Sequence, residues 1–172
     1  SGIPARLRAG VARGPEQFRQ KAEIAVAGGA DLLKVIASGA VFAYGGEPGE
    51  PEMTPEEIAA VAQVAHSHGL KLAAHAHGAR SIREAILAGA DTIEHGLSLH
   101  REPRLLDGMA ERGTVLVPTL STFHDLAERF VDDFAPVLVD QAKRQLDEAM
   151  LTVEVARQAG VTMALGYDSG PP

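Results

Sequence analysis

Five side chains that can bind a metal ion or move a proton fall in short apolar stretches of the chain. Lys34 lies inside LLKVI, His75 and His77 close LAAHAH, His95 closes ADTIEH and Asp168 closes VTMALGYD. The chain has no cysteine, so disulfides and thiolate zinc sites are excluded. A metal ion would be held by His, Asp, Glu or a modified side chain, and two histidines with an aspartate suit zinc or a similar divalent cation.

Lys34 has an unusual setting, because an unpaired ammonium inside an apolar strand is costly or loses its proton. Three interpretations stay open. The side chain could reach past the strand end to solvent, it could form a Schiff base as in aldolases, or its neutral amine could combine with carbon dioxide to a carbamate. A carbamate is an anionic oxygen ligand that can bridge two divalent cations, and the nearby imidazoles and carboxylate favour it.

The elements that carry these residues repeat one pattern: a helical stretch, a glycine, then a short apolar run. The glycines suit the left-handed position that ends a helix, and they are Gly29, Gly69, Gly89, Gly113 and Gly160. Short, continuously apolar runs separated by helices are typical of a parallel α/β sheet buried on both faces. We predict strands over about 31–37, 71–76, 91–95, 114–119 and 162–168, with the longest helix over about 137–158.

The polar residues recur at similar distances from these glycines. His75, His95 and Thr119 fall six residues after their glycine, Lys34 five and Asp168 eight. They therefore lie toward the carboxyl ends of parallel strands, the edge where α/β folds bind ligands. A lone histidine there would most often be a core residue bonded to a backbone carbonyl, but the matched offsets favour one shared site.

Alternation along 71–77 divides that run between two faces. One face carries Lys71, Ala73, His75 and His77, and the face toward the helices carries Leu72, Ala74 and Ala76. Two capping boxes mark helix starts, at Thr54 with Glu57 and at Ser81 with Glu84.

Composition limits the class of protein. The 172 residues are 45% hydrophobic and carry a net charge of −7, with no cluster of basic residues, so a nucleic-acid partner is not expected and a small molecule is. No apolar run approaches the roughly 20 residues of a membrane span. We expect a cytoplasmic location, although a signal peptide ahead of Ser1 stays open.

The order Lys, His, His, Asp resembles the amidohydrolase superfamily. The phrases ADLLKVIASGAV, LKLAAHAHG, ADTIEHG, GTVLVPTL and a final G-x-DSG are similar to its imidazolonepropionase-like and Xaa-Pro dipeptidase-like branch, over residues 10–170. The resemblance implies a (β/α)8 barrel with one or two divalent metal ions, expected to be zinc. By the same resemblance Lys34 is the carboxylated lysine of strand four, and His75 and His95 are ligands on strands five and six. Asp168 is the ligand on strand eight that also takes a proton from the attacking water.

Two further residues are expected to contact substrate. His77 lies a layer beyond His75, with metal binding as its alternative role. Tyr44 lies in the glycine- and proline-rich stretch 41–53, which is expected to form a rim loop; a solvated loop tip is its alternative.

The chain departs from the family pattern at one end. No H-x-H pair precedes Lys34, so we expect residues 1–172 to be the C-terminal part of the barrel domain, strands four to eight, and to be inactive alone. Two unpaired sheet edges would favour pairing with the missing part of the barrel or with another copy. Tyr167 also stands where the family usually has threonine, on the side facing the helices.

The expected reaction is hydrolysis of an amide, in a dipeptide or an N-acyl amino acid. Two alternatives stay open: a mononuclear hydrolase of the imidazolonepropionase or deaminase kind, and a noncatalytic barrel fragment.

Overall fold

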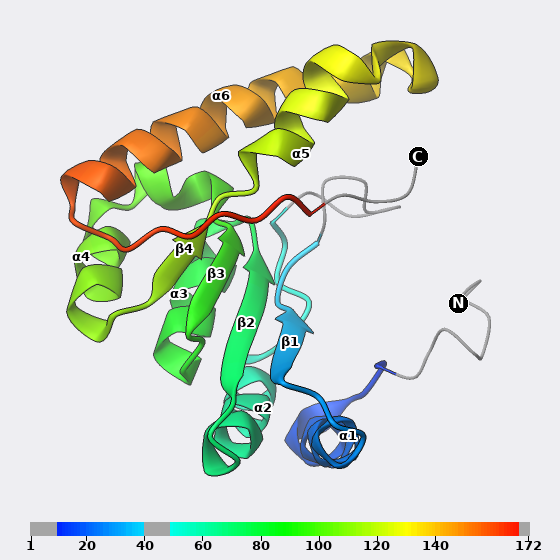
Figure 1. The fold of residues 1–172 in the computed structure, drawn as a ribbon, viewed down its shortest axis with the longest axis vertical. Coiled ribbons are helices and arrows are strands. Elements are labelled where there is room, and N and C mark those ends of the chain that lie inside the picture. The colour runs from blue at the N-terminus through cyan, green and yellow to red at the C-terminus, as the bar shows by residue number, and fades with distance from the viewer. Residues whose placement is uncertain (1–9, 40–48, 169–172) are drawn as a thin grey trace.

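A computed structural model of the protein describes residues 10–39 and 49–168. Four parallel strands form one sheet in the order β1-β2-β3-β4, as Figure 1 shows. Their bounds are β1 Leu32–Ile36, β2 Lys71–Ala76, β3 Thr92–His95 and β4 Val115–Val117. The α-helices are α1 Gly14–Ala27, α2 Pro55–Ser67, α3 Ala79–Ala88, α4 Pro103–Arg112, α5 Leu120–His124 and α6 Pro136–Gln158, joined by the short helices η2 Leu97–Arg101, η3 Asp125–Arg129 and η4 Val131–Asp133.

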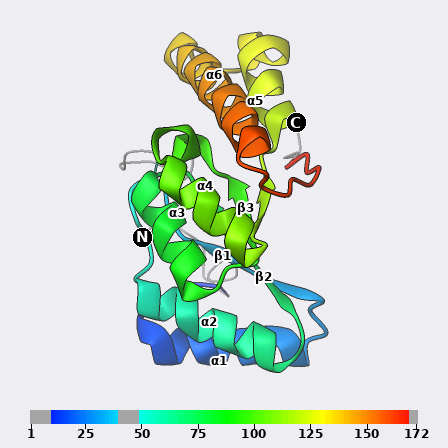
Figure 2. The same ribbon diagram turned by 90° about the vertical axis from the view of Figure 1, so that its left-hand side faces the viewer.

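The sheet packs its helix-facing side into the main core. Leu72, Ala74 and Ala76 of β2 are fully buried there, and α2 and α3 contact this part of the sheet. α5 and α6 lie together at the opposite end of the molecule from α1 and α2 (Figures 1 and 2). The alternation predicted for 71–77 is confirmed, because hydrophobic burial follows period two along the strand.

The prediction of a fifth strand over 162–168 is wrong. Residues 162–168 run beside β4 but share with it only a bridge between Leu116 and Met163. Two hydrogen bonds join the segments: Leu116 N donates to Thr162 O, and Ala164 N donates to Leu116 O, both at 2.9 Å. β4 is also shorter than predicted, because Pro118 lacks an N–H and Thr119 leaves the extended conformation at φ 47. A three-residue strand has few backbone N–H and C=O groups with which a neighbouring segment can form hydrogen bonds.

Helix ends follow the sequence signals with one exception. All five predicted helix-ending glycines have positive φ, and the capping box of Thr54 and Glu57 forms as predicted. The box predicted at Ser81 is wrong, since α3 already begins at Ala79 after Gly78. Ser81 lies in the first turn and donates its hydroxyl to Gly49 O at 3.2 Å.

The described part of the chain contains no helix that joins the length and the apolar character needed to cross a bilayer.

Candidate metal centre

Three histidines meet at the carboxyl ends of β2 and β3. The ring centroids of His75, His77 and His95 are 4.5 to 4.7 Å apart. Each offers a ring nitrogen within 4.8 Å of those of the other two. These three residues are 7%, 3% and 4% exposed, so bulk water has little access to the cluster. His77 is stacked on His95, with 22° between the ring planes.

His95 reaches this cluster through its backbone. In the parallel ladder His95 pairs with Ala76, while His75 pairs with Glu94, so regular alternation would point His95 to the helix side with Ile93. Instead His95 has φ 70, and its ring Nε2 lies 2.9 Å from Nδ1 of His75. The left-handed residue turns the imidazole across to the face of His75.

Positive φ at residues other than glycine is confined, in the described ranges, to the ends of three neighbouring segments. The residues are His95, Thr119 and Asp168, with φ of 70, 47 and 54. Such conformations cost about 1–3 kcal/mol each and gather at functional sites. Thr119 places its hydroxyl 2.7 Å from Nδ1 of His95, which fixes the orientation of that ring.

Asp168 borders the cluster beside His95. Its carboxylate oxygen Oδ2 lies 3.8 Å from Nε2 of His95, and its side chain is half exposed. The hydroxyl of Thr122 in α5 donates to the carbonyl of Asp168 at 3.0 Å and also to that of Tyr167. Tyr167 donates to Asp125, so the segment that carries Asp168 is held against α5 and η3.

Lys34 lies on the same face as the histidines but lower in the ladder. It pairs with Ala73, two residues before His75, an offset of about 6.6 Å along the strand. In the described chain Lys34 is exposed and lines an open cavity of about 530 Å³ between α1 and β1. Its charge lowers the pKa of His75 and of His95.

Burial keeps the three imidazoles neutral at pH 7. Desolvation is the largest cause in each case; it lowers the pKa of His77 to about 3, with a further contribution from His75. It lowers the pKa of His95 to about 2, helped by His77, His75 and Lys34. The pKa of His75 is lowered by burial and by Lys34, against the opposing charge of Asp168. Neutral imidazoles are the form that binds metal ions.

The cluster contains ring nitrogens that the described chain does not satisfy. Nε2 of His75 and both ring nitrogens of His77 are buried without a hydrogen-bond partner in the described residues. Buried polar atoms are nearly always satisfied, and an exception calls for a water, an ion or a catalytic role. Three close neutral imidazoles with free nitrogens are the donor set that zinc and similar cations prefer, so these residues fit a divalent metal ion.

The structure brings together His75, His77, His95 and Asp168 from the residues predicted for the site, with Lys34 on the same face below them. Tyr44 lies outside the described residues, and its role stays a prediction. Sequence reasoning missed Phe123 of α5, whose ring centroid lies 6.4 Å from that of His77 and 6.1 Å from that of His95. Phe123 does not lie at the end of an apolar run, because it follows the turn at Thr119 on a short helix, so the pattern that selected the other residues did not include it.

Comparison with known proteins identifies related chains. A family model described as Amidohydrolase family matches residues 2–171. Ochratoxinase from Aspergillus niger is 30% identical over 165 residues, which cover 94% of this chain and 33% of the relative. The crystal structure of a Xaa-Pro dipeptidase with bound methionine in the active site is similar with a TM-score of 0.83 and 33% identity, over 93% of this chain and 39% of that one.

A prolidase complexed with N-methylphosphonate-L-proline is similar with a TM-score of 0.84 and 29% identity, over 92% of this chain and 38% of that one. The chain thus spans about a third of the length of the curated relatives it matches. Its parallel strands and covering helices form part of a (β/α)8 barrel, as predicted.

Proposed function

Because this chain belongs to the amidohydrolase family, we propose that the protein hydrolyses amide bonds with a divalent metal ion held at the carboxyl ends of its strands. One observation carries the proposal: three buried imidazoles converge within 4.8 Å and leave ring nitrogens unsatisfied. Leaving such groups unpaired costs free energy, and a bound cation removes that cost.

His75, His95, Asp168 and Lys34 would hold the metal, which we propose to be zinc, as one ion or two. Lys34 would bind as a carbamate, formed when its neutral amine adds to carbon dioxide and releases a proton. The place of Lys34 supports this role, since it shares the face of His75 and its long side chain can span the two-residue offset between them. His77 contributes a third imidazole or contacts the substrate.

A divalent cation bound there would polarise the scissile carbonyl and lower the pKa of water. Residues of this chain would orient a metal ligand, transfer the proton and exclude bulk water. Thr119 orients the ring of His95 through Nδ1. Asp168 lies half exposed beside His95, where its carboxylate can accept a proton from the attacking water and pass it to the leaving nitrogen. The burial of His77 and Phe123 excludes bulk water from the inner side of the site.

The proposed substrate is a dipeptide or an N-acyl amino acid. The names of the similar proteins support this class: a Xaa-Pro dipeptidase, a prolidase complexed with a phosphonate-proline compound and an ochratoxinase. Tyr44 remains a candidate substrate contact.

A mononuclear hydrolase is the second candidate. It is favoured by one observation: the three histidines approach one another without Lys34, which is exposed in the described chain. One ion bound by imidazoles would then serve the reaction, and Lys34 would stay unmodified.

β1 is an edge strand of the described sheet, and its residues Leu32 and Ile36 are 52% and 47% exposed. We propose that this edge and face are covered by the rest of the barrel or by a second copy of the chain. Residues 1–172 alone are then expected to be inactive.

Metal analysis tests the proposed function. The protein is expressed with bicarbonate and zinc and compared with Lys34→Ala and His75→Ala, with His68→Ala as the control because His68 lies exposed in the cap of α2 beside Glu23. About two zinc ions per chain, reduced in both site variants, would support the lysine-bridged hydrolase. About one ion, lost only in His75→Ala, would select the mononuclear enzyme. No bound metal in any sample would leave a noncatalytic barrel.

A further inference from the structure

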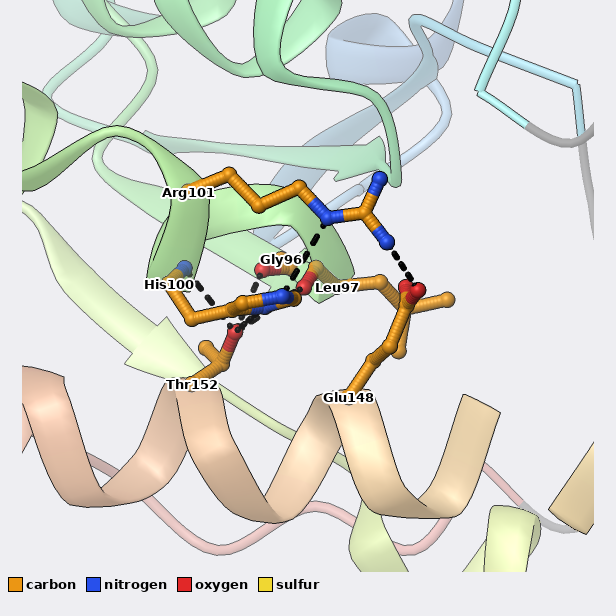
Figure 3. Close-up of polar contacts among 6 residues, drawn as sticks. All are labelled: Gly96, Leu97, His100, Arg101, Glu148 and Thr152. Atoms are coloured by element: carbon orange, nitrogen blue, oxygen red, sulfur yellow. Dashed lines mark hydrogen bonds and ion pairs between the residues drawn. The ribbon is translucent and has the colours of Figure 1, made fainter. Parts of the chain in front are cut away.

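A buried hydroxyl of α6 contacts the turn that follows His95. Thr152 of α6 is fully buried. Its Oγ1 lies 2.9 Å from the carbonyl oxygen of Leu97 and 3.4 Å from that of Gly96, the two residues directly after His95. Figure 3 shows Thr152 pointing from α6 toward this turn.

The other side of the same turn is tied to β2, next to the histidine cluster. Gly96 N donates to Ala76 O at 3.1 Å, and Ser98 N donates to His77 O at 3.0 Å. The turn therefore connects Thr152 on one side with the backbone of His77 on the other. Any shift of Leu97 would move both His95, through the chain, and the hydrogen bond to His77.

Neighbouring contacts stiffen the connection. His100 N lies 3.3 Å from Oγ1 of Thr152, and Nδ1 of His100 lies 2.9 Å from Leu97 O, which makes Nδ1 the protonated ring nitrogen. Nε2 of His100 then accepts from Nε of Arg101 at 3.2 Å. Arg101 also pairs with Glu148, which precedes Thr152 by one helical turn, as Figure 3 shows.

The conformation of His95 requires such support. Its φ of 70 and the φ of 66 at Gly96 place two successive residues in the left-handed region. A left-handed residue other than glycine persists where its surroundings determine it. Without the turn, regular alternation would point the imidazole away from His75.

We propose that Thr152 is a positioning residue, whose hydroxyl clamps the Leu97 and Gly96 carbonyls and so holds the His95 imidazole in the histidine cluster. The role in metal binding rests on the proposed function, whereas the role in holding the turn does not. Thr152 touches neither substrate nor reacting atoms and acts through the turn alone.

The first test is hydrogen exchange in the metal-free full chain, read at the amides of Gly96 and Ser98. Thr152→Val removes the hydroxyl at nearly constant shape, and Thr152→Ser keeps it. In Thr152→Val we expect the protection of both amides to fall at least tenfold beyond the mean change of the core amides, while Thr152→Ser stays within about threefold of the wild type. Thr152→Ala removes the same hydroxyl with a smaller side chain and serves if Thr152→Val does not fold.

The control is Val139→Ala, a buried position on α6 more than three turns before Thr152. It is expected to lower protection evenly, with no excess at Gly96 and Ser98. An even loss in Thr152→Val or Thr152→Ala, matching that of Val139→Ala, would overturn the proposal.

The second test is zinc affinity, measured by competition with a chelator. Residues that orient a metal ligand typically change affinity 10- to 100-fold when removed. We expect a loss in that range for Thr152→Val and little change for Thr152→Ser and Val139→Ala. An unchanged affinity in Thr152→Val would also overturn the positioning role. If the wild type itself binds no zinc, the proposed function fails, and hydrogen exchange alone decides whether Thr152 holds the turn.

Discussion

Nε2 of His95 lies 2.9 Å from Nδ1 of His75, although the ladder pairs His95 with Ala76. Two neighbouring strands therefore bring their histidines together only because one of them leaves the extended conformation at its last residue. The left-handed backbone of His95, followed by a left-handed Gly96, turns the ring across the end of β3. The cluster depends on this turn as much as on the three imidazoles.

Gly96→Ala should destabilise the protein by more than the strain of a left-handed alanine alone. A Cβ at Gly96 would lie 2.8 Å from Cδ1 of Leu116 and 2.9 Å from Cδ1 of Leu99, whereas one at Gly113, with a similar φ of 71, would meet nothing within 4 Å. We expect Gly113→Ala to lower the free energy of unfolding by about 1–2 kcal/mol and Gly96→Ala by about 3 kcal/mol, since overpacking adds to the strain. Urea unfolding measures both, and equal losses would contradict the crowding described at Gly96.

The sequence predicted the frame of the fold well, because its signals are local. Helix-ending glycines need a left-handed residue wherever the helix packs, so all five were placed correctly, and apolar runs located β1, β2 and β3 to within two residues. The errors have tertiary causes. Ser81 and Glu84 form a capping pattern, but the close approach of Gly78 to Gly49 coincides with the start of α3 one turn earlier.

The candidate site was predictable in its residue types but not in its geometry. Matched offsets from the glycines selected His75 and His95, yet the offsets hide the shift of one residue between their strands. The turn at His95 compensates for that shift, and no local sequence pattern predicts this turn. Thr152 and Phe123 reach the site from helices that follow it in the chain, so only packing of α5 and α6 reveals them.

Acid should destabilise the metal-free chain well before its carboxylates titrate. The pKa values of His77 and His95 are lowered by burial to about 3 and about 2, and that of His75 is lowered as well, from an unfolded value of about 6.5. Below about pH 6.5 these histidines bind protons in the unfolded chain but not in the folded chain. The free energy of unfolding is therefore highest above this pH and decreases as the pH drops. We expect His77 and His95 each to contribute a loss of about 1 kcal/mol between pH 7 and pH 5.5, and His75 to act in the same direction.

Chemical unfolding at several pH values with a chelator present measures this loss. His77→Gln should reduce this loss by about 1 kcal/mol, since one buried imidazole is removed. The same pH dependence in His77→Gln and the wild type would mean that His77 is not buried as a neutral imidazole.

Glu57 should stabilise the protein more than its surface position on α2 suggests. Its Oε2 accepts from Thr54 N at 2.9 Å and its Oε1 accepts from Gly14 N at 2.7 Å, so one carboxylate caps α2 and ties it to the start of α1. We expect Glu57→Ala to cost about 1–2 kcal/mol, because two backbone N–H groups lose their acceptor. Glu56→Ala, at the exposed neighbouring position, should cost less than about 0.5 kcal/mol. Thermal unfolding of the two variants distinguishes them, and equal midpoints would argue against the tie between the helices.

Thr119 should control how the His95 ring presents its Nε2 to a metal ion, if the proposed function holds. The hydroxyl lies 2.7 Å from Nδ1 of His95, and the side chain is buried. Thr119→Val removes this hydrogen bond and frees the ring to rotate, so zinc affinity should fall by about 10- to 100-fold. Thr114→Val provides the matched control, because Thr114 is equally buried but precedes β4 at its opposite end. Chelator competition gives both affinities, and a Thr119→Val protein that binds zinc as tightly as the Thr114→Val protein would show that the ring is oriented by its packing on His77 rather than by Thr119.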